Sequence, residues 1–128
     1  MNNYTILIME DNEDINLLTK TTLAYKQYNV LSAFNGKEGI KMANDNKIDL
    51  IILDVMMPDM DGYEVLQVLK SCNATKNIPV VFFSAKTQEE EIKRGLRLGA
   101  IKYFTKPFDP VTFLNEVEQL LLMCEKNK

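Results

Sequence analysis

The most constraining feature of the sequence is a run of four apolar residues, Leu50 to Leu53, that ends on the carboxylate of Asp54. Every residue of the run is apolar, which is typical of a strand buried on both faces at the centre of a parallel sheet. Pro58 and the pair Asp61-Gly62 follow closely, so a loop comes directly after the strand. Open α/β sheets bind ligands at the carboxyl ends of their strands, which makes Asp54 a candidate site residue. The alternative interpretation is that Asp54 caps the next helix.

The composition is that of one ordinary globular domain, with 128 residues, 46% hydrophobic and 26% charged. The net charge is −3 without a Lys/Arg cluster, so we expect no direct contact with nucleic acid. No apolar run approaches the roughly 20 residues of a membrane span and no signal peptide is evident, so we expect a cytoplasmic protein away from the membrane. Histidine is absent, and Cys72 and Cys124 are expected to be free thiols. Any chemistry must therefore use carboxylates, hydroxyls and lysine.

Strand-like and helix-like patterns alternate along the chain, as in α/β proteins with a parallel sheet. The predicted strands cover residues 5–9, 28–34, 50–53, 78–83 and 100–105. The predicted helices cover residues 15–25, 36–44, 63–69, 88–98 and 110–124. Asp14 and Asp109 are candidate amino-terminal caps, and Gly99 is a candidate carboxyl-terminal cap. We predict a doubly wound, five-stranded parallel sheet between two layers of helices, with residues 28–34 as an edge strand.

Polar residues capable of chemistry follow four of the five predicted strands. They are Glu10 and Asp11 after the first strand, Asp54 after the third, Ser84 after the fourth and Lys106 after the fifth. The carboxyl ends of parallel strands lie along the same edge of a sheet. We therefore expect these side chains to form one site.

Three carboxylates in one pocket repel one another, by about 1 kcal/mol for a pair about 4 Å apart in water and about 4 kcal/mol at an effective dielectric of about 20. A bound cation relieves this repulsion, and oxygen ligands without histidine or thiolate favour Mg²⁺ or Mn²⁺. Such ions typically serve phosphoryl chemistry, in which an aspartate can itself be the nucleophile. The residues predict a metal-assisted phosphoryl acceptor with Asp54 as nucleophile, Lys106 as a positive charge and Ser84 as a hydroxyl donor.

Four motifs in this order and at these spacings carry a resemblance to a known family. They are the acidic pair Glu10-Asp11, Asp54 with Pro58 and Gly62, Ser84-Ala85, and Tyr103 with Lys106-Pro107-Phe108. Together they resemble the receiver domains of two-component response regulators over essentially the whole chain, residues 1–128. The resemblance implies a flavodoxin-like, three-layer sandwich of five helices and a sheet of order 2-1-3-4-5.

The resemblance also implies roles for individual residues. Asp54 would be phosphorylated, and Mg²⁺ would be held by Asp11, Asp54 and the backbone carbonyl of Met56, with Glu10 reaching it through water. Ser84 and Lys106 would bind phosphoryl oxygens, and a cis bond would join Lys106 to Pro107. Tyr103 would be a switch aromatic that works with Ser84, although the residues alone favour a half-exposed packing residue at this position.

A histidine kinase or a histidine phosphotransfer domain is the phosphodonor that the resemblance implies. The chain would catalyse only its own phosphorylation and slow dephosphorylation, and would signal through the face formed by residues 88–98, 100–105 and 110–124. With no output domain after it, the chain resembles single-domain regulators, but a receiver excised from a hybrid kinase or a multidomain regulator would look the same. Ile101-Lys102 stand where winged-helix members usually carry paired acids, which weakens the expectation of their shared salt-bridged dimer. A phosphorylation-dependent homodimer stays an alternative.

Two expectations concern surfaces and lifetime. We expect Ile15 to be exposed beside the site with Pro107 and Phe108 and to dock against a helical phosphodonor, with partial burial of Ile15 as the alternative. Met56 and Lys86 are poorly suited to orient an attacking water, so the phosphoryl group is expected to persist for minutes or longer.

Three rival classes are less consistent with the sequence. A haloacid-dehalogenase-like phosphatase needs a second acid where Met56 stands. A flavin-binding flavodoxin would have its phosphate repelled by the acidic segment 10–14. A receiver that no longer takes phosphate, or a purely structural domain, would need no metal.

Overall fold

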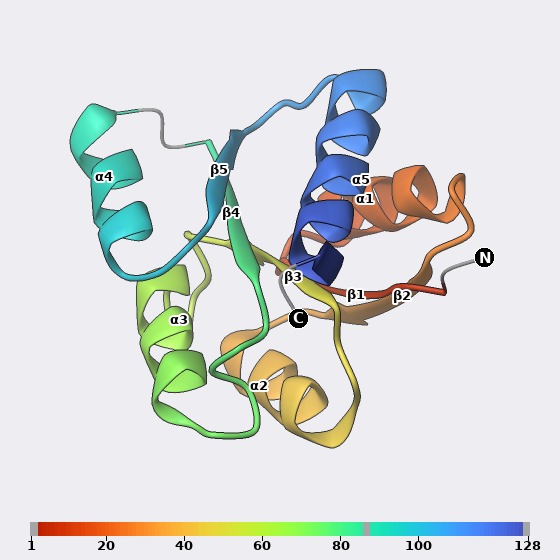
Figure 1. Ribbon diagram of the computed structural model, residues 1–128. Coiled ribbons are helices and arrows are strands. Elements are labelled where there is room, and N and C mark those ends of the chain that lie inside the picture. Colours follow the sequence, from red (N-terminus) through yellow and green to blue (C-terminus); the bar gives the residue numbers. More distant parts are fainter. Residues whose placement is uncertain (1–2, 86–87, 127–128) are drawn as a thin grey trace.

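The computed structural model describes residues 3–85 and 88–126, which form five strands and five helices in strict alternation (Figure 1). The strands are β1 (Thr5–Met9), β2 (Asn29–Ala33), β3 (Leu50–Asp54), β4 (Val80–Ser84) and β5 (Lys102–Thr105). The helices are α1 (Glu13–Ala24), α2 (Gly36–Asp45), α3 (Gly62–Ser71), α4 (Glu89–Arg97) and α5 (Pro110–Lys126). The predicted alternation is confirmed, and every predicted boundary lies within two residues of the observed one.

All strands run parallel, in the order β2-β1-β3-β4-β5. The strand order reverses between β1 and β3, and at this point the ends of the strands are in register, with Met9 opposite Leu53. Ser84 at the end of β4 lies opposite Thr105 at the end of β5. The doubly wound fold and the edge position of β2 are therefore confirmed, and the residues that follow β1 and β3 are brought side by side.

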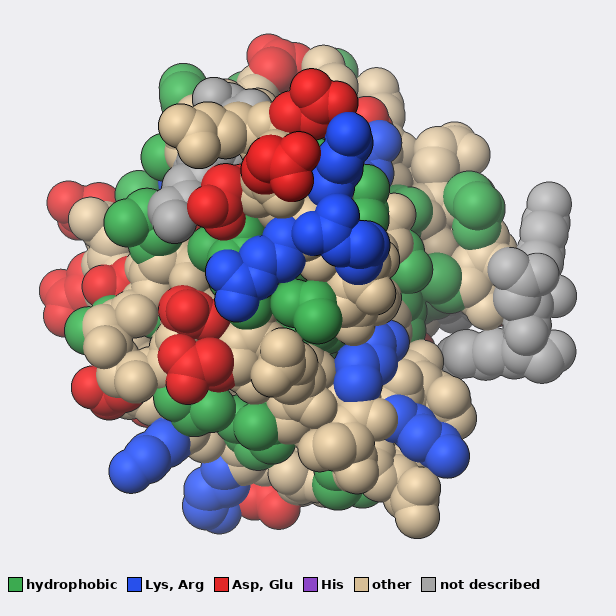
Figure 2. All heavy atoms as spheres, turned by 90° about the vertical axis from the view of Figure 1, so that its left-hand side faces the viewer, with side chains coloured by type: hydrophobic (Ala, Val, Ile, Leu, Met, Phe, Trp, Pro, Cys, Tyr) green, Lys and Arg blue, Asp and Glu red, His purple; other side chains and the backbone are tan. Residues whose placement is uncertain are grey.

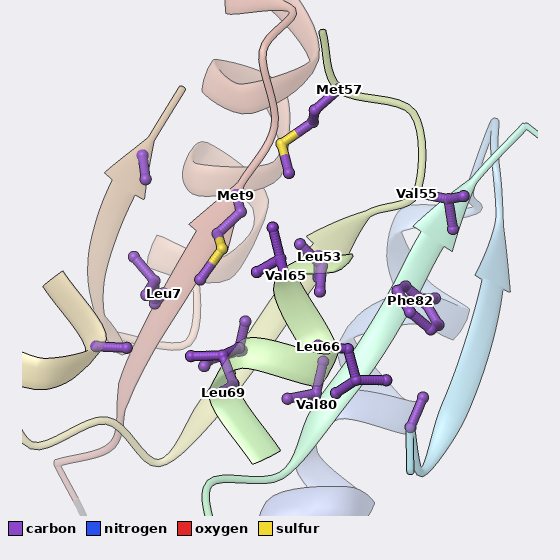
Figure 3. Close-up of a cluster of buried hydrophobic side chains, with 14 of the residues drawn as sticks. Leu7, Met9, Leu53, Val55, Met57, Val65, Leu66, Leu69, Val80 and Phe82 are labelled. Carbon is purple, nitrogen blue, oxygen red and sulfur yellow. The ribbon is translucent and has the colours of Figure 1, made fainter. Parts of the chain in front are cut away.

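Two hydrophobic clusters hold the layers together, one on each face of the sheet. The first joins the sheet to α2 and α3 and includes Leu53, Phe82, Val65 and Leu66 (Figure 3). The second joins the opposite face to α1 and α5 through residues such as Ile52, Phe83 and Phe113. Neighbouring residues of one strand thus enter different clusters, which is why β3 and β4 are apolar at successive positions.

The helix ends show which acidic residues are caps. Asp14 was predicted to cap the first helix, and this is wrong: α1 begins at Glu13, and the Asn12 side chain accepts a hydrogen bond from the Ile15 amide at 2.9 Å. Asn12 has the extended backbone that a cap requires, whereas Asp14 lies within the first turn. Asp61 caps α3 by accepting from the Glu64 amide at 2.9 Å, so Asp54 is not needed as a cap.

Two further caps were predicted correctly. Gly99 follows α4 with φ of 115°, a left-handed conformation that favours glycine. Asp109 accepts from the Thr112 amide at 2.9 Å at the start of α5. Neither cysteine forms a disulfide among the described residues, and within the same part of the chain no helix is long and apolar enough to cross a membrane.

Candidate functional site

Three carboxylates converge where β1 and β3 end. Glu10 and Asp11 directly follow β1, and Asp54 is the last residue of β3. One ligand oxygen from each of the three lies within 4.8 Å of the others. Glu10 and Asp54 are buried, while Asp11 is exposed and open to an approaching ion or ligand. The predicted acidic cluster is therefore present.

Lys106 supplies the positive charge of the cluster. It follows β5, and its backbone amide donates to the Ser84 carbonyl at 2.9 Å, which ties it to the end of β4. Its Nζ atom contacts the Glu10 carboxylate and lies 3.3 Å from Asp54 Oδ2. The bond to Pro107 is cis, as expected. Sequence positions 10, 54 and 106 thus meet in one ion-pair network.

One lysine does not balance three carboxylates. Burial raises the pKa of Glu10, and the neighbouring Asp54 raises it further, against the opposing effect of Lys106. The pKa of Asp11 is also raised, first by burial and then by Glu10. Raised pKa values mean that the ionised forms of these carboxyl groups are less stable in the site than in water, and a bound cation would stabilise them. An all-oxygen group of this kind fits a hard divalent cation such as Mg²⁺.

The loop after Asp54 is pressed against the start of α3. The Met56 amide donates to Asp54 Oδ1 at 3.2 Å, and the Gly62 amide donates to the Val55 carbonyl at 2.7 Å. A Cβ on Gly62 would lie 2.6 Å from the Asp54 carbonyl oxygen, so only glycine allows this approach. The Met56 side chain is exposed, as expected of a residue assigned a role through its backbone.

Ser84 and Tyr103 lie on the neighbouring strands. Ser84 is fully buried at the end of β4, and Tyr103 on β5 is half-buried with its ring centroid 5.9 Å from that of Phe82. The Tyr103 hydroxyl is itself buried and has no hydrogen-bond partner within residues 3–85 and 88–126. Burial raises the pKa of this phenol. Tyr103 is thus a half-buried packing residue in this conformation, and its role as a switch stays a prediction.

The expected exposure of the docking residues is wrong in part, and docking itself stays a prediction. Ile15 and Phe108 are partly buried and pack against the α1–α5 cluster, and of the three predicted residues Pro107 is exposed. Ile15 lies in the first turn of α1, where its amide donates to the Asn12 side chain, and it packs against the cluster that contains Phe83. Lys86, which was expected to influence phosphoryl lifetime, lies outside the described residues.

Sequence reasoning missed Asn16. This side chain is buried, and its Nδ2 donates to the carbonyls of Glu10 at 2.9 Å and Ala33 at 3.2 Å. It therefore fixes the ends of β1 and β2 beside the acidic pair. Its place on the inward face of α1, in helical spacing with Thr19 and Leu23, was the signal that could have revealed it.

Comparison with known proteins agrees with this site. The family described as the response regulator receiver domain matches residues 6–118. The transcriptional regulatory protein RprY of Bacteroides fragilis is 38% identical over 125 residues, covering 96% of this chain and 52% of that protein. The response regulator SaeR of Staphylococcus aureus is 36% identical over 121 residues, covering 94% of this chain and 52% of that protein. The chain thus spans about half the length of these curated relatives.

Solved structures give the same result. A CheY-like receiver domain protein from Methanospirillum hungatei superposes with a TM-score of 0.91 at 26% identity, over 99% of this chain and all of that one. A receiver domain of a signal transduction histidine kinase from Syntrophus aciditrophicus superposes with a TM-score of 0.83 at 33% identity. The match covers 92% of this chain and 89% of that one.

The fold and the acidic site define a phosphoacceptor-type α/β domain. The chain belongs to the response regulator receiver domain family of two-component systems.

Proposed function

We propose that this receiver domain accepts a phosphoryl group on Asp54 from a histidine kinase or a histidine phosphotransfer protein, in a reaction that needs Mg²⁺. One observation carries the proposal. The ligand oxygens of Glu10, Asp11 and Asp54 lie within 4.8 Å of one another, with Lys106 Nζ 3.3 Å from Asp54. Structural caps have no reason to converge in this way, whereas a nucleophile, a metal site and a phosphoryl-binding cation must.

The transfer step forms one bond and breaks one. A carboxylate oxygen of Asp54 attacks phosphorus, and the bond from phosphorus to the donor imidazole breaks, leaving its electron pair on a nitrogen that takes up a proton. Lys106 binds a phosphoryl oxygen and stabilises its charge, and the Ser84 hydroxyl donates a hydrogen bond to another phosphoryl oxygen. The product is an acyl phosphate on Asp54 and a free histidine on the donor.

The metal site uses this chain's own oxygens. Asp11, Asp54 and the Met56 carbonyl are the proposed direct ligands of Mg²⁺ or Mn²⁺, and Glu10 acts through water and through Lys106. An ion held by these oxygens would supply positive charge against the phosphoryl oxygens. The raised pKa of Glu10 and of Asp11, caused chiefly by burial, supports a need for that ion.

Signal output is proposed to use the face of α4, β5 and α5, with Tyr103 and Ser84 as the switch. The protein would be a cytoplasmic regulator that catalyses only its own phosphorylation and slow dephosphorylation. Two arrangements are compatible with relatives about twice as long: a single-domain regulator, and a receiver that is part of a hybrid kinase or multidomain regulator. The similar receiver of a histidine kinase supports the second.

Intact-mass spectrometry tests the proposal. The protein is incubated with acetyl phosphate and Mg²⁺, and we expect the gain of one phosphoryl group that peptide mapping places on Asp54. Chelation of the metal and the substitution Asp54→Asn should each abolish the gain. A haloacid-dehalogenase-like phosphatase would instead release phosphate continuously. Modification that persists in Asp54→Asn, or none in the unsubstituted protein, would refute the assignment.

A further inference from the structure

A pocket of about 450 Å³ opens beside the acidic cluster, between the loop after β3 and the helices α3 and α4. It is lined by Asp11, Val55, Met56, Met57, Pro58, Asp61, Tyr63 and Arg94. Asp11 and Met56 belong to the proposed metal site, so the pocket leads directly to it. Arg94, on α4, is the cation among the lining residues. Figure 2 shows this side of the molecule, where basic side chains run across the face with acidic side chains around them.

Arg94 is held in place at the wall of the pocket. Its guanidinium carbon lies 4.1 Å from the centroid of the Tyr63 ring. Tyr63 is buried, and its hydroxyl donates to a Glu91 carboxylate oxygen at 2.6 Å and contacts the Glu91 carbonyl at 3.1 Å. The ring is therefore a fixed platform that joins α3 to α4. The N–H donors of a guanidinium lie in its plane, so a guanidinium whose flat face rests on a ring can still donate hydrogen bonds from its edge.

No carboxylate among the described residues forms an ion pair with this guanidinium. Arg94 forms no salt bridge with any residue in the described part of the chain, whereas Lys106 contacts both Glu10 and Asp54. Arg94 is also exposed, so a small anion can reach it. A positioned, unpaired arginine in a pocket beside a phosphoryl site is suited to bind a carboxylate or a phosphate.

We propose that Arg94 binds the leaving group of small acyl phosphate donors, and the proposal rests on Asp54 as the phosphoryl acceptor. Attack and departure at phosphorus are roughly in line, so the leaving group points away from Asp54 towards the open side of the site. As the bond from Asp54 to phosphorus forms, the bond to the acyl oxygen breaks and its electron pair stays on that oxygen. The product is a carboxylate, and Arg94 donates hydrogen bonds to it as its charge develops.

Two donors that differ in their leaving group test this role. Acetyl phosphate releases the anion acetate, whereas phosphoramidate releases ammonia, which takes a proton and carries no negative charge for Arg94 to bind. The rate of Asp54 phosphorylation is measured with each donor and Mg²⁺ for the unsubstituted protein, for Arg94→Gln and for Arg97→Gln. Arg97 lies on the same helix and is exposed, but it is not among the pocket-lining residues, so its variant matches the change in net charge. Urea unfolding shows that each variant is folded.

We expect Arg94→Gln to lower the rate with acetyl phosphate about tenfold, the factor for one charge-assisted hydrogen bond. The rate with phosphoramidate should stay within about twofold, and Arg97→Gln should change neither rate by more than that. The inference is overturned if Arg94→Gln lowers both rates equally or neither, or if Arg97→Gln has the same effect. Failure of both donors to modify the unsubstituted protein would instead overturn the assignment of Asp54.

Discussion

The ammonium group of Lys106 lies 3.3 Å from Asp54 Oδ2. It also contacts Glu10, so a single cation is shared between two of the three carboxylates of the site. This arrangement offsets part of the repulsion between the two carboxylates, but it also places a positive charge beside the position proposed for Mg²⁺. Lysine and metal therefore oppose each other electrostatically while both favour the charge of a phosphoryl group.

The substitution Lys106→Gln should separate these two effects. Removing a unit charge a few ångströms from the ion should tighten Mg²⁺ binding about fivefold, the equivalent of about 1 kcal/mol. Phosphorylation of Asp54 should nevertheless slow about tenfold or more, because a phosphoryl-binding group is lost. Titration calorimetry with Mg²⁺ and the rate with acetyl phosphate measure the two quantities. Lys102→Gln is the matched control, since Lys102 pairs with Glu116 at 3.1 Å; weaker Mg²⁺ binding in Lys106→Gln would contradict the charge argument.

Gly62→Ala should destabilise the protein and disturb the site together. The new methyl group would lie 2.6 Å from the Asp54 carbonyl oxygen and 2.8 Å from Val55 Cα, both of them backbone atoms that cannot rotate away. We expect a loss of about 1–3 kcal/mol in the free energy of unfolding, measured with urea. Gln67→Ala, at an exposed position of the same helix, should change it by less than about 0.5 kcal/mol. Equal free energies of unfolding for the two variants would contradict this, because they would mean that the loop after Asp54 can move aside to make room for the methyl group.

Two tyrosines should respond oppositely to loss of their hydroxyls. The Tyr103 hydroxyl is buried without a partner among the described residues, so Tyr103→Phe should leave stability unchanged or raise it by up to about 1 kcal/mol. The Tyr63 hydroxyl donates to Glu91 at 2.6 Å, so Tyr63→Phe should lower stability by about 1 kcal/mol. Urea midpoints of the two variants make the comparison. A large loss in Tyr103→Phe would reveal a hydrogen bond from this hydroxyl.

Asp109 should make stability depend on pH at the acidic end. Hydrogen bonds from the amide and the hydroxyl of Thr112 lower the pKa of Asp109 below its ordinary 3.8. The carboxylate therefore stabilises the folded state above pH 3.8, and this contribution is lost as the pH falls through the lowered value. Asp109→Ala should be less stable than the unsubstituted protein at pH 7, with the difference shrinking towards pH 3. Asp109→Asn also lacks the titrating carboxylate, so its difference from the unsubstituted protein should change over the same pH range. A difference that is independent of pH in both variants would contradict the assignment to Asp109.

The central strands were predictable because burial on both faces leaves a direct mark on the sequence. Residues 50–54 and 80–84 are buried throughout, and runs of apolar residues are the signal of that environment. The site followed from the same reasoning, since Glu10, Asp54 and Lys106 all follow strands that end at one edge. No long-range contact had to be known for that step.

Other features depend on contacts that sequence spacing does not reveal. Asn12 and Asp14 are both good caps, and only the backbone angles of the loop after β1 distinguish them. Ile15 packs against the α1–α5 cluster, a contact that its place in the sequence does not fix. Arg94 and Tyr63 lie 31 positions apart, on two helices whose relative placement is set by packing on Phe82 and its neighbours.

The strands β3 and β4 have an evolutionary consequence. Each has four apolar residues followed by one polar residue, Asp54 or Ser84. The apolar four are committed to the two clusters and leave little freedom to vary, whereas the last residue of each strand is buried but belongs to neither cluster. Selection can therefore exchange the reactive group at either position, and with it the chemistry, while inheriting the scaffold unchanged.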